Sequence, residues 1–232
     1  AMSFCAQDER VRSITLVDLD IRVVELTQKH IPSLWGNTWE NYEGRLRYCF
    51  EDALTFLQRE QLPFDIIISD ITDPNEGESA AHLLGHEFFT AIRTRLAPNG
   101  ILAMQSGEYA TDTRTAHEGF LSLVSQNFAY CLTVAAYIPW FSAEWSFTFA
   151  QNDNPFPDFT NIFAVRGIFR KHPELVSKLR ALTKGKLVAL FAATESDSPL
   201  DPRYRSRTFF AVGPRNNMNR PDPSLRVPPP AD

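Results

Sequence analysis

Two absences narrow the class of protein that this sequence describes. The apolar runs, such as the stretch 131–136 that only Thr133 interrupts, fall far short of the roughly 20 residues that a membrane-spanning helix requires. The first residues also lack the basic, apolar and small-residue order of a signal peptide. We therefore expect a chain that neither spans a membrane nor is exported.

Cysteine is scarce as well. The chain has three cysteines, an odd number at widely spaced positions, namely Cys5, Cys49 and Cys131. This pattern predicts neither a disulfide framework nor a zinc site, and reduced thiols fit a cytoplasmic location. His82 and His86 are spaced to share one helix face, but no third ligand is near them in the sequence. We therefore expect no bound metal.

Charge is distributed unevenly along the chain, although the net charge is only −5. Residues 31–80 carry ten acidic residues against three arginines, a balance of −7, whereas residues 151–232 carry thirteen basic against eight acidic residues, a balance of +5. An acidic region around a cleft attracts cations and repels phosphates, which favours a cationic substrate and argues against nucleic acid. A solvated acidic surface is the alternative interpretation.

Short β-rich runs alternate with helical patterns over the first 150 residues, which is typical of βαβ units and a parallel sheet. We predict strands at 13–17, 46–49, 64–69, 101–105, 130–137 and 144–150, the last two as an antiparallel pair at the sheet edge. Helices are predicted at 21–31, 53–60, 86–96 and 113–127. The predicted fold is an α/β, Rossmann-like domain of the class I methyltransferase type, with a mostly parallel sheet and helices on both faces.

Composition changes near Asp153, where a run of Asn, Pro and Phe residues indicates a domain boundary. We predict the Rossmann-like domain over residues 1–152 and a C-terminal α/β appendage over 153–220, with a helix at 173–182 and strands at 187–191 and 208–212. Residues 221–232 contain five prolines, and we expect this tail to be extended or disordered.

Acidic residues close three of the predicted strands. In an open α/β sheet ligands bind beyond the carboxyl ends of the strands, so these acids are candidates for a binding site. Asp18 offers two acceptor oxygens that suit the paired hydroxyls of a ribose, and Asp52 could accept from the amine of an adenine. Helix capping is the alternative role for Asp20 and Asp52.

Asp70 and Asp73 stand three residues apart after the clearest predicted strand, with Pro74 following. Two carboxylates at a strand end can hold a cationic amine and take a proton from it. One would then be the base and the other the anchor. The same pattern also makes an ordinary turn, in which Asp bonds its own backbone and Pro fixes φ.

Several segments together resemble the polyamine aminopropyltransferase family, the spermidine and spermine synthases. "ITLVDLD", "FEDALTFL", "FDIIISDITDP", "ILAMQSGEY" and "YIPWFSAEWSFTFA" occur in the order and at roughly the spacings of that family, over about residues 10–150. The resemblance implies transfer of an aminopropyl group from decarboxylated S-adenosylmethionine, the co-substrate, to a di- or polyamine, with release of methylthioadenosine and no need for a metal. Family members commonly associate as homodimers through parts that this chain lacks, so a homodimer is the weakest of these expectations.

The resemblance also assigns roles to individual residues. It implies that Asp70 is the catalytic base. It implies two further groups, a nucleoside group of Asp18, Leu19, Asp52 and Ala53, and an amine-binding group of Asp73, Gln105, Tyr137 and Trp145.

The sequence also departs from the family pattern. None of its ten glycines lies within two residues of another, so the glycine-rich loop after the family's first strand has no counterpart. The chain begins at the helix downstream of that loop, so we expect the usual first strand to be missing. That strand is normally central, and two sheet halves would then lack the ladder that joins them. The alternatives are a truncated gene, further upstream residues, or a strand supplied by another chain or by the tail. Ala53, Ser106 and Ala135 also depart, which leaves the acceptor amine open.

Two other functions fit parts of the same pattern. One is a methyltransferase on the same fold, although the paired acids and the acidic middle suit an amine better than most methyl acceptors. The other is a non-catalytic relative that kept the sheet and lost the cofactor loop.

Overall fold

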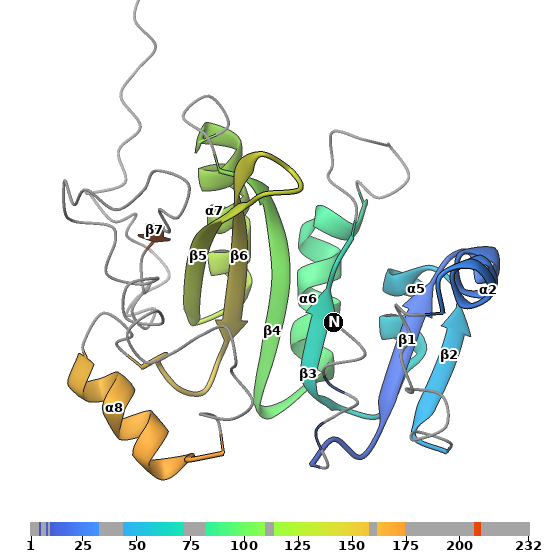
Figure 1. The fold of residues 1–232 in the computed structure, drawn as a ribbon, viewed down its shortest axis with the longest axis horizontal. Helices are drawn as coiled ribbons and strands as arrows, with labels where there is room; N and C mark the ends of the chain where they lie inside the picture. Colours follow the sequence, from blue (N-terminus) through green and yellow to red (C-terminus); the bar gives the residue numbers. More distant parts are fainter. Residues whose placement is uncertain are drawn as a thin grey trace, which may run out of the picture.

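The computed structural model describes residues 5, 8, 10–32, 44–71, 82–109, 114–157, 162–174 and 207–209 of the chain. Strands and helices alternate over most of these ranges (Figure 1). In chain order the elements are β1 (Ile14–Asp18), α2 (Ile21–His30), β2 (Leu46–Phe50), α5 (Ala53–Arg59), β3 (Phe64–Ser69), α6 (His86–Arg95), β4 (Leu96–Glu108), α7 (Arg114–Asn127), β5 (Tyr130–Ile138), β6 (Ala143–Gln151), α8 (Ile162–Lys171) and β7 (Arg207–Phe209).

The strands form two sheets. β1 and β2 pair in parallel, with Asp18 opposite Phe50 where both strands end. The second sheet has the order β3-β4-β6-β5-β7, in which β3 and β4 are parallel and the other three pairings are antiparallel. Within the described ranges no ladder joins β1 to β3. The expectation of two sheet halves without a joining ladder is therefore confirmed for these residues.

One hydrophobic core lies beneath both sheets. Val17 of β1, Cys49 of β2, Ile67 of β3 and Met104 of β4 all pack against the same cluster. The helical members of that cluster are buried side chains of α5, α6 and α7 and the residue after α7, namely Phe56, Leu57, Phe88, Phe89, Ile92, Val124 and Phe128. Strands of both sheets bury one face against a single core, so the two sheets form one interrupted layer.

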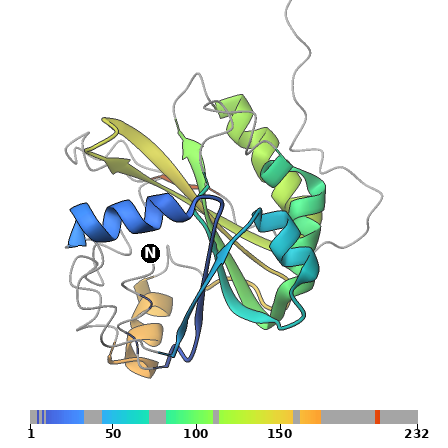
Figure 2. The same cartoon turned by 90° about the vertical axis from the view of Figure 1, so that its right-hand side faces the viewer.

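Helices lie on both sides of this layer. Figure 2 shows α5, α6 and α7 on one side and α2 on the other. The arrangement is the predicted Rossmann-like α/β fold, although its sheets are more mixed than a mostly parallel sheet because β6, β5 and β7 add antiparallel pairings. No helix in the part of the chain that the structure describes is long and apolar enough to cross a membrane.

Most predicted elements of the first 150 residues occur within a few residues of their predicted bounds. β3 has the predicted bounds, and β5 and β6 form the predicted antiparallel pair, with β7 added outside β5. β4 begins earlier than predicted because α6 ends at Arg95 and Leu96 already pairs with Phe64. The backbone of this strand is locally irregular, since Asn99 has a positive φ of 62°.

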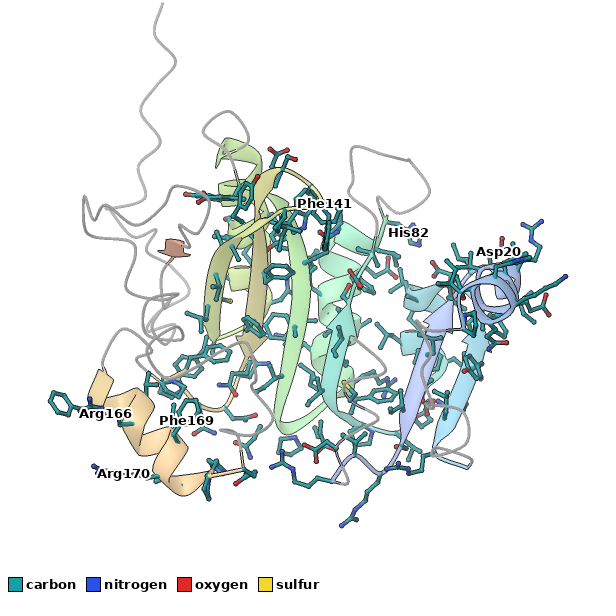
Figure 3. The ribbon with its side chains drawn as sticks, in the orientation of Figure 1. Asp20, His82, Phe141, Arg166, Phe169 and Arg170 are labelled. Carbon is teal, nitrogen blue, oxygen red and sulfur yellow. The ribbon has the colours of Figure 1, made fainter. Side chains whose placement is uncertain are left out.

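α8 was not predicted from the sequence. Its buried residues Val165 and Phe169 are four positions apart, whereas Phe163, Arg166 and Arg170 are exposed. Figure 3 labels Phe169, Arg166 and Arg170 on this helix. The sequence does not indicate a helix here, because Gly167 and the β-branched residues of this segment are poor helix formers. Only the first two residues of the predicted helix 173–182 are described, as part of a turn, and the predicted strand 187–191 and tail 221–232 lie outside the described residues. The domain boundaries stay predictions.

An ion pair joins β2 to the end of α5. The Arg47 guanidinium donates to the Glu60 carboxylate, which also accepts from the backbone amides of Gln61 and Leu62 at 2.9 and 3.1 Å. These hydrogen bonds, the one from Arg47 foremost, lower the pKa of Glu60 to about 2. The carboxylate therefore ties the helix end to the strand in its ionised form.

This ion pair makes stability depend on pH in the acid range. A carboxyl group with a lowered pKa in the folded state stabilises it fully above its ordinary value of 4.5 and loses this effect as the pH falls towards 2. We expect the difference in free energy of unfolding between wild type and Glu60→Gln to be constant above about pH 5 and to shrink below pH 4.5. Urea unfolding at a series of pH values measures it, and a difference that stays constant down to pH 2 would contradict the assignment.

Candidate active site

Three acidic residues follow three strands at the carboxyl edge, the side of the layer at which β1, β2, β3 and β4 end. Asp18 is the last residue of β1, Asp52 comes two residues after β2, and Asp70 comes directly after β3. The arrows of β1, β2 and β3 point the same way in Figure 1. The fold thus places these predicted site residues at one edge, where open α/β sheets bind ligands.

Asp18 and Asp20 have different roles in the structure. Asp20 caps α2, since its Oδ1 accepts from the backbone amide of Arg22 at 2.9 Å. It also pairs with the Arg22 guanidinium, and the hydrogen bonds from that side chain and amide lower the pKa of Asp20 to about 2. The half-buried Asp18 accepts at Oδ1 from the backbone amide of Asp20 at 2.9 Å. Asp18 keeps acceptor capacity for a ligand, and the adjoining Leu19 is 64% exposed.

Asp52 is both a helix cap and a hydrogen-bond partner of a histidine. Its Oδ1 accepts from the backbone amide of Thr55 at 2.9 Å and from the Thr55 hydroxyl at 3.1 Å, which caps α5 directly before Ala53. Its Oδ2 lies 2.5 Å from Nε2 of His82. Burial opposes ionisation of this carboxyl, but the bonds from Thr55 and His82 outweigh it and lower the pKa of Asp52. The capping alternative for Asp20 and Asp52 is therefore correct, without excluding a ligand.

Sequence reasoning missed the contact between His82 and Asp52. The two residues are 30 positions apart, and His82 was considered only as a metal ligand beside His86. In the structure Nδ1 of His86 lies 3.2 Å from Nδ2 of Asn127, so the two histidines have separate partners. Figure 3 shows His82 at the same end of the molecule as Asp20.

Asp70 is exposed, and the residue before it is buried. Ser69 is 6% exposed, and its buried Oγ has no hydrogen-bond partner among the described residues. Buried hydroxyls are nearly always hydrogen-bonded, so a buried Oγ without a partner next to Asp70 can still bond a water or a ligand. The second acid of the predicted pair, Asp73, lies outside the described residues.

Gln105 connects the end of β3 to β6. Its Nε2 donates to the backbone carbonyl of Ile71 at 2.5 Å, and its Oε1 accepts from the indole Nε1 of Trp145 at 2.5 Å. The structure thereby brings the chain next to Asp70 together with two residues of the predicted amine-binding group. Gln105 thus fixes the positions of Ile71 and Trp145 through the two ends of its side-chain amide.

Aromatic side chains surround the turn between β5 and β6. The ring of Phe141 lies 4.8 Å from that of Trp145, centroid to centroid, and Figure 3 shows Phe141 at the carboxyl edge. Tyr137 sits opposite Glu144 in the β5–β6 ladder, one residue from Trp145. Its half-buried side chain lies on the other face of this ladder from that of Trp145, because Trp145 pairs with Ala136 and successive side chains of a strand alternate between faces. The structure thus brings Gln105 and Trp145 together but does not bring Tyr137 to them.

A chain of hydroxyls, buried except for the half-buried Ser106, crosses β4, β6 and β5. Ser106 Oγ lies 3.1 Å from Ser146 Oγ and 2.9 Å from Thr148 Oγ1, which in turn lies 2.9 Å from Thr133 Oγ1. Ser106, which departs from the family pattern, thus bonds within the sheet. Buried polar networks of this kind fix the register of neighbouring strands.

Known proteins of one family are similar to this chain. Residues 7–161 match the family model described as spermine/spermidine synthase domain. A polyamine aminopropyltransferase of Prochlorococcus marinus (strain MIT 9313) is 33% identical over 153 residues, which cover 65% of this chain and 52% of the relative. One of Korarchaeum cryptofilum (strain OPF8) is 30% identical, with 61% and 43% covered. The chain spans about half the length of the curated relatives it matches.

Solved structures share the fold. A spermidine synthase in complex with the transition state analogue AdoDATO has a TM-score of 0.62 at 21% identity, covering 80% of this chain and 59% of that chain. The spermidine synthase from Thermotoga maritima has a TM-score of 0.57 at 19% identity, covering 80% and 57%. These likenesses confirm the Rossmann-like α/β fold.

The two roles of Asp52 can be separated by substitution. Replacing a capping Asp by Ala costs about 1 kcal/mol, whereas Asn caps nearly as well. We expect Asp52→Ala to lower the free energy of unfolding by about that amount and Asp52→Asn to lower it by clearly less. Urea unfolding at pH 7 measures both, and equal losses would show that the charge facing His82, rather than the cap, carries the stabilisation.

Proposed function

This chain belongs to the spermine/spermidine synthase domain family, and from that premise we propose that it transfers an aminopropyl group from decarboxylated S-adenosylmethionine to a di- or polyamine. The observation that carries the proposal is the exposed Asp70 at the end of β3, on the same edge as Asp18 and Asp52. The proposed transfer requires a base for the amine and a binding site for the nucleoside. The carboxyl edge provides carboxylate acceptors for both.

The nucleoside end of the co-substrate would bind at Asp18 and Asp52. Among the described residues Asp18 accepts one hydrogen bond, from the backbone amide of Asp20 to Oδ1. The remaining acceptor positions of its carboxylate can therefore accept from two ribose hydroxyls. Asp52 retains acceptor capacity at Oδ2 for the adenine amine, beside His82. Leu19 and Ala53 follow these acids directly in the chain and would contact the nucleoside.

The amine end would lie near Asp70. A protonated amine is not a nucleophile, so Asp70 would take one proton while Asp73 holds a remaining ammonium group. The nitrogen lone pair then forms a bond to the propyl carbon, the carbon–sulfur bond breaks, and its electron pair stays on sulfur. The sulfonium becomes the neutral thioether of methylthioadenosine, so the leaving group needs no metal and no oxyanion hole.

The other amine-binding residues suit a long cation. Gln105 holds Trp145 and the chain beside Asp70 in place, and the aromatic face of Trp145 can contact methylene groups or an ammonium. The excess of acidic residues over residues 31–80 favours the same class of substrate. A cytoplasmic location and a homodimer stay predictions.

Ligand binding separates this proposal from its alternatives. Calorimetric titration of the chain with methylthioadenosine and with S-adenosylmethionine compares the product of aminopropyl transfer with the donor of methyl transfer. We expect methylthioadenosine to bind more tightly. Preference for S-adenosylmethionine would favour a methyltransferase, and binding of neither would favour a non-catalytic relative.

Substitution of the base tests the mechanism itself. Removing a general base typically costs about 10²–10⁴-fold in rate, so we expect Asp70→Asn to lose aminopropyl transfer by that factor while methylthioadenosine binds as before. Asp65→Asn, an exposed acid on the same strand, is the matched control and should leave transfer unchanged. Transfer by Asp70→Asn at the wild-type rate would rule out this base.

A further inference from the structure

His82 makes a single side-chain hydrogen bond within the described part of the chain, and its partner is Asp52. The Nε2 atom of His82 lies 2.5 Å from Oδ2 of Asp52, and the two side chains are 45% and 26% exposed. His82, labelled in Figure 3, precedes α6, whereas Asp52 precedes α5. The contact therefore joins the starts of two helices at the carboxyl edge.

Neither helix needs this hydrogen bond for its own start. α5 is capped by the other oxygen of the carboxylate, since Asp52 Oδ1 accepts from Thr55. α6 has Gly85 as its N-cap, without a side-chain bond. Buried side chains of both helices already pack in one core, and Arg95 of α6 donates to the backbone carbonyl of Leu57 in α5 at 2.8 Å. Because exposed charged pairs add little to stability, the contact has little value for the fold.

The contact determines which atoms of the pair can still accept a hydrogen bond. Burial opposes ionisation of Asp52, but the bonds from Thr55 and His82 outweigh it and lower the pKa of the carboxyl. An ionised carboxylate only accepts, so Nε2 of His82 carries the proton and donates it. Oδ1 accepts twice from Thr55 and Oδ2 once from His82. One of about four acceptor positions of the carboxylate is then left, on Oδ2.

We infer that His82 is a positioning residue of the nucleoside site, which holds Oδ2 of Asp52 so that one oriented acceptor position is left for the exocyclic amine of a purine. This inference rests on the proposed function, in which Asp52 accepts from that amine, and adds the group that orients the acceptor. The open position takes a hydrogen bond from a 6-amino group and repels a 6-oxo group. A site built around such an acceptor rejects a ligand without the donor, because the acceptor is then left unpaired.

Removal of the His82 imidazole would affect the two oxygens of Asp52 differently. Oδ1 would keep both of its bonds from Thr55, so the cap of α5 would remain. Oδ2 would bond water in place of the imidazole, and a ligand amine would have to displace that water from an acceptor that is no longer oriented. The loss therefore falls on ligand binding rather than on folding.

Ligand selectivity of the full chain tests this role. Calorimetric titration compares methylthioadenosine with methylthioinosine, its 6-oxo analogue. We expect wild type to prefer methylthioadenosine, and His82→Ala to bind it about tenfold more weakly while its affinity for methylthioinosine stays the same. His82→Gln, whose side-chain amide can donate in place of Nε2, should restore most of the affinity. His30→Ala, which removes an exposed histidine at the end of α2, is the control and should bind as wild type does.

Two further measurements separate positioning from a purely structural role. Urea unfolding of His82→Ala should give the wild-type midpoint, and a lower midpoint with unchanged affinity would overturn the inference. In an Asp52→Asn background, which keeps a capping side chain, His82→Ala should cause no further loss of affinity, because its effect acts through the carboxylate. A full tenfold loss in that background would also contradict this role. If wild type bound no methylthioadenosine, the proposed nucleoside site itself would fail, whereas equal binding by wild type and His82→Ala would remove only the role of His82.

Discussion

Hydrogen bonding between parallel strands is the constraint that brings the acidic residues of this protein together. The ladder of β1 with β2 sets Asp18 beside the start of the segment that carries Asp52, and the ladder of β3 with β4 sets Asp70 beside Gln105. Among the described residues, these two pairs of strands are connected only through the hydrophobic core that they share. The distance from the nucleoside acids to the base therefore depends on side-chain packing beneath the layer, which is weaker in directing strands than a ladder is.

Helices and strands that are marked by local sequence signals could be predicted from the sequence. Contacts between residues far apart in the chain mostly could not. β3 is an apolar run with Pro63 before it and Asp70 after it, so both bounds could be read directly, and Asp20 marked the start of α2. The acids at the carboxyl edge could be predicted because they stand at the ends of these strands in the sequence. The bonds of Gln105 to Ile71 and Trp145 cross 34 and 40 positions and depend on an irregular β4–β6 register that no local pattern encodes.

His82 illustrates the same limit. Its spacing from His86 is a local pattern that suggested a shared metal, whereas its partner Asp52 is brought close only when the start of α5 and the turn before α6 come together. α8 was missed for the opposite reason. Its own composition, with Gly167 and several β-branched residues, disfavours a helix, and burial of Val165 and Phe169 outweighs that local preference.

Capping and ligand binding are compatible at Asp52 because a carboxylate has about four acceptor positions. Thr55 and His82 together supply three hydrogen bonds, two to one oxygen and one to the other. These bonds keep the carboxylate ionised and fix its orientation, so a ligand amine that approaches Oδ2 meets an acceptor already in place. The helix cap thus preorganises the same group that the nucleoside would use.

The exposure of Asp70 places a further requirement on the proposed reaction. A carboxylate in contact with water is a weak base towards an ammonium, and a low-dielectric surrounding strengthens it. Among the described residues Asp70 is open, and its neighbours Ile71 and Ser69 are the half-buried and buried groups of that strand end. The dry surrounding would then come from the substrates themselves, the propyl chain and thioether on one side and the methylene groups of the amine on the other. Binding and proton transfer would be coupled in this way, so that the proton is removed only when both reactants are present.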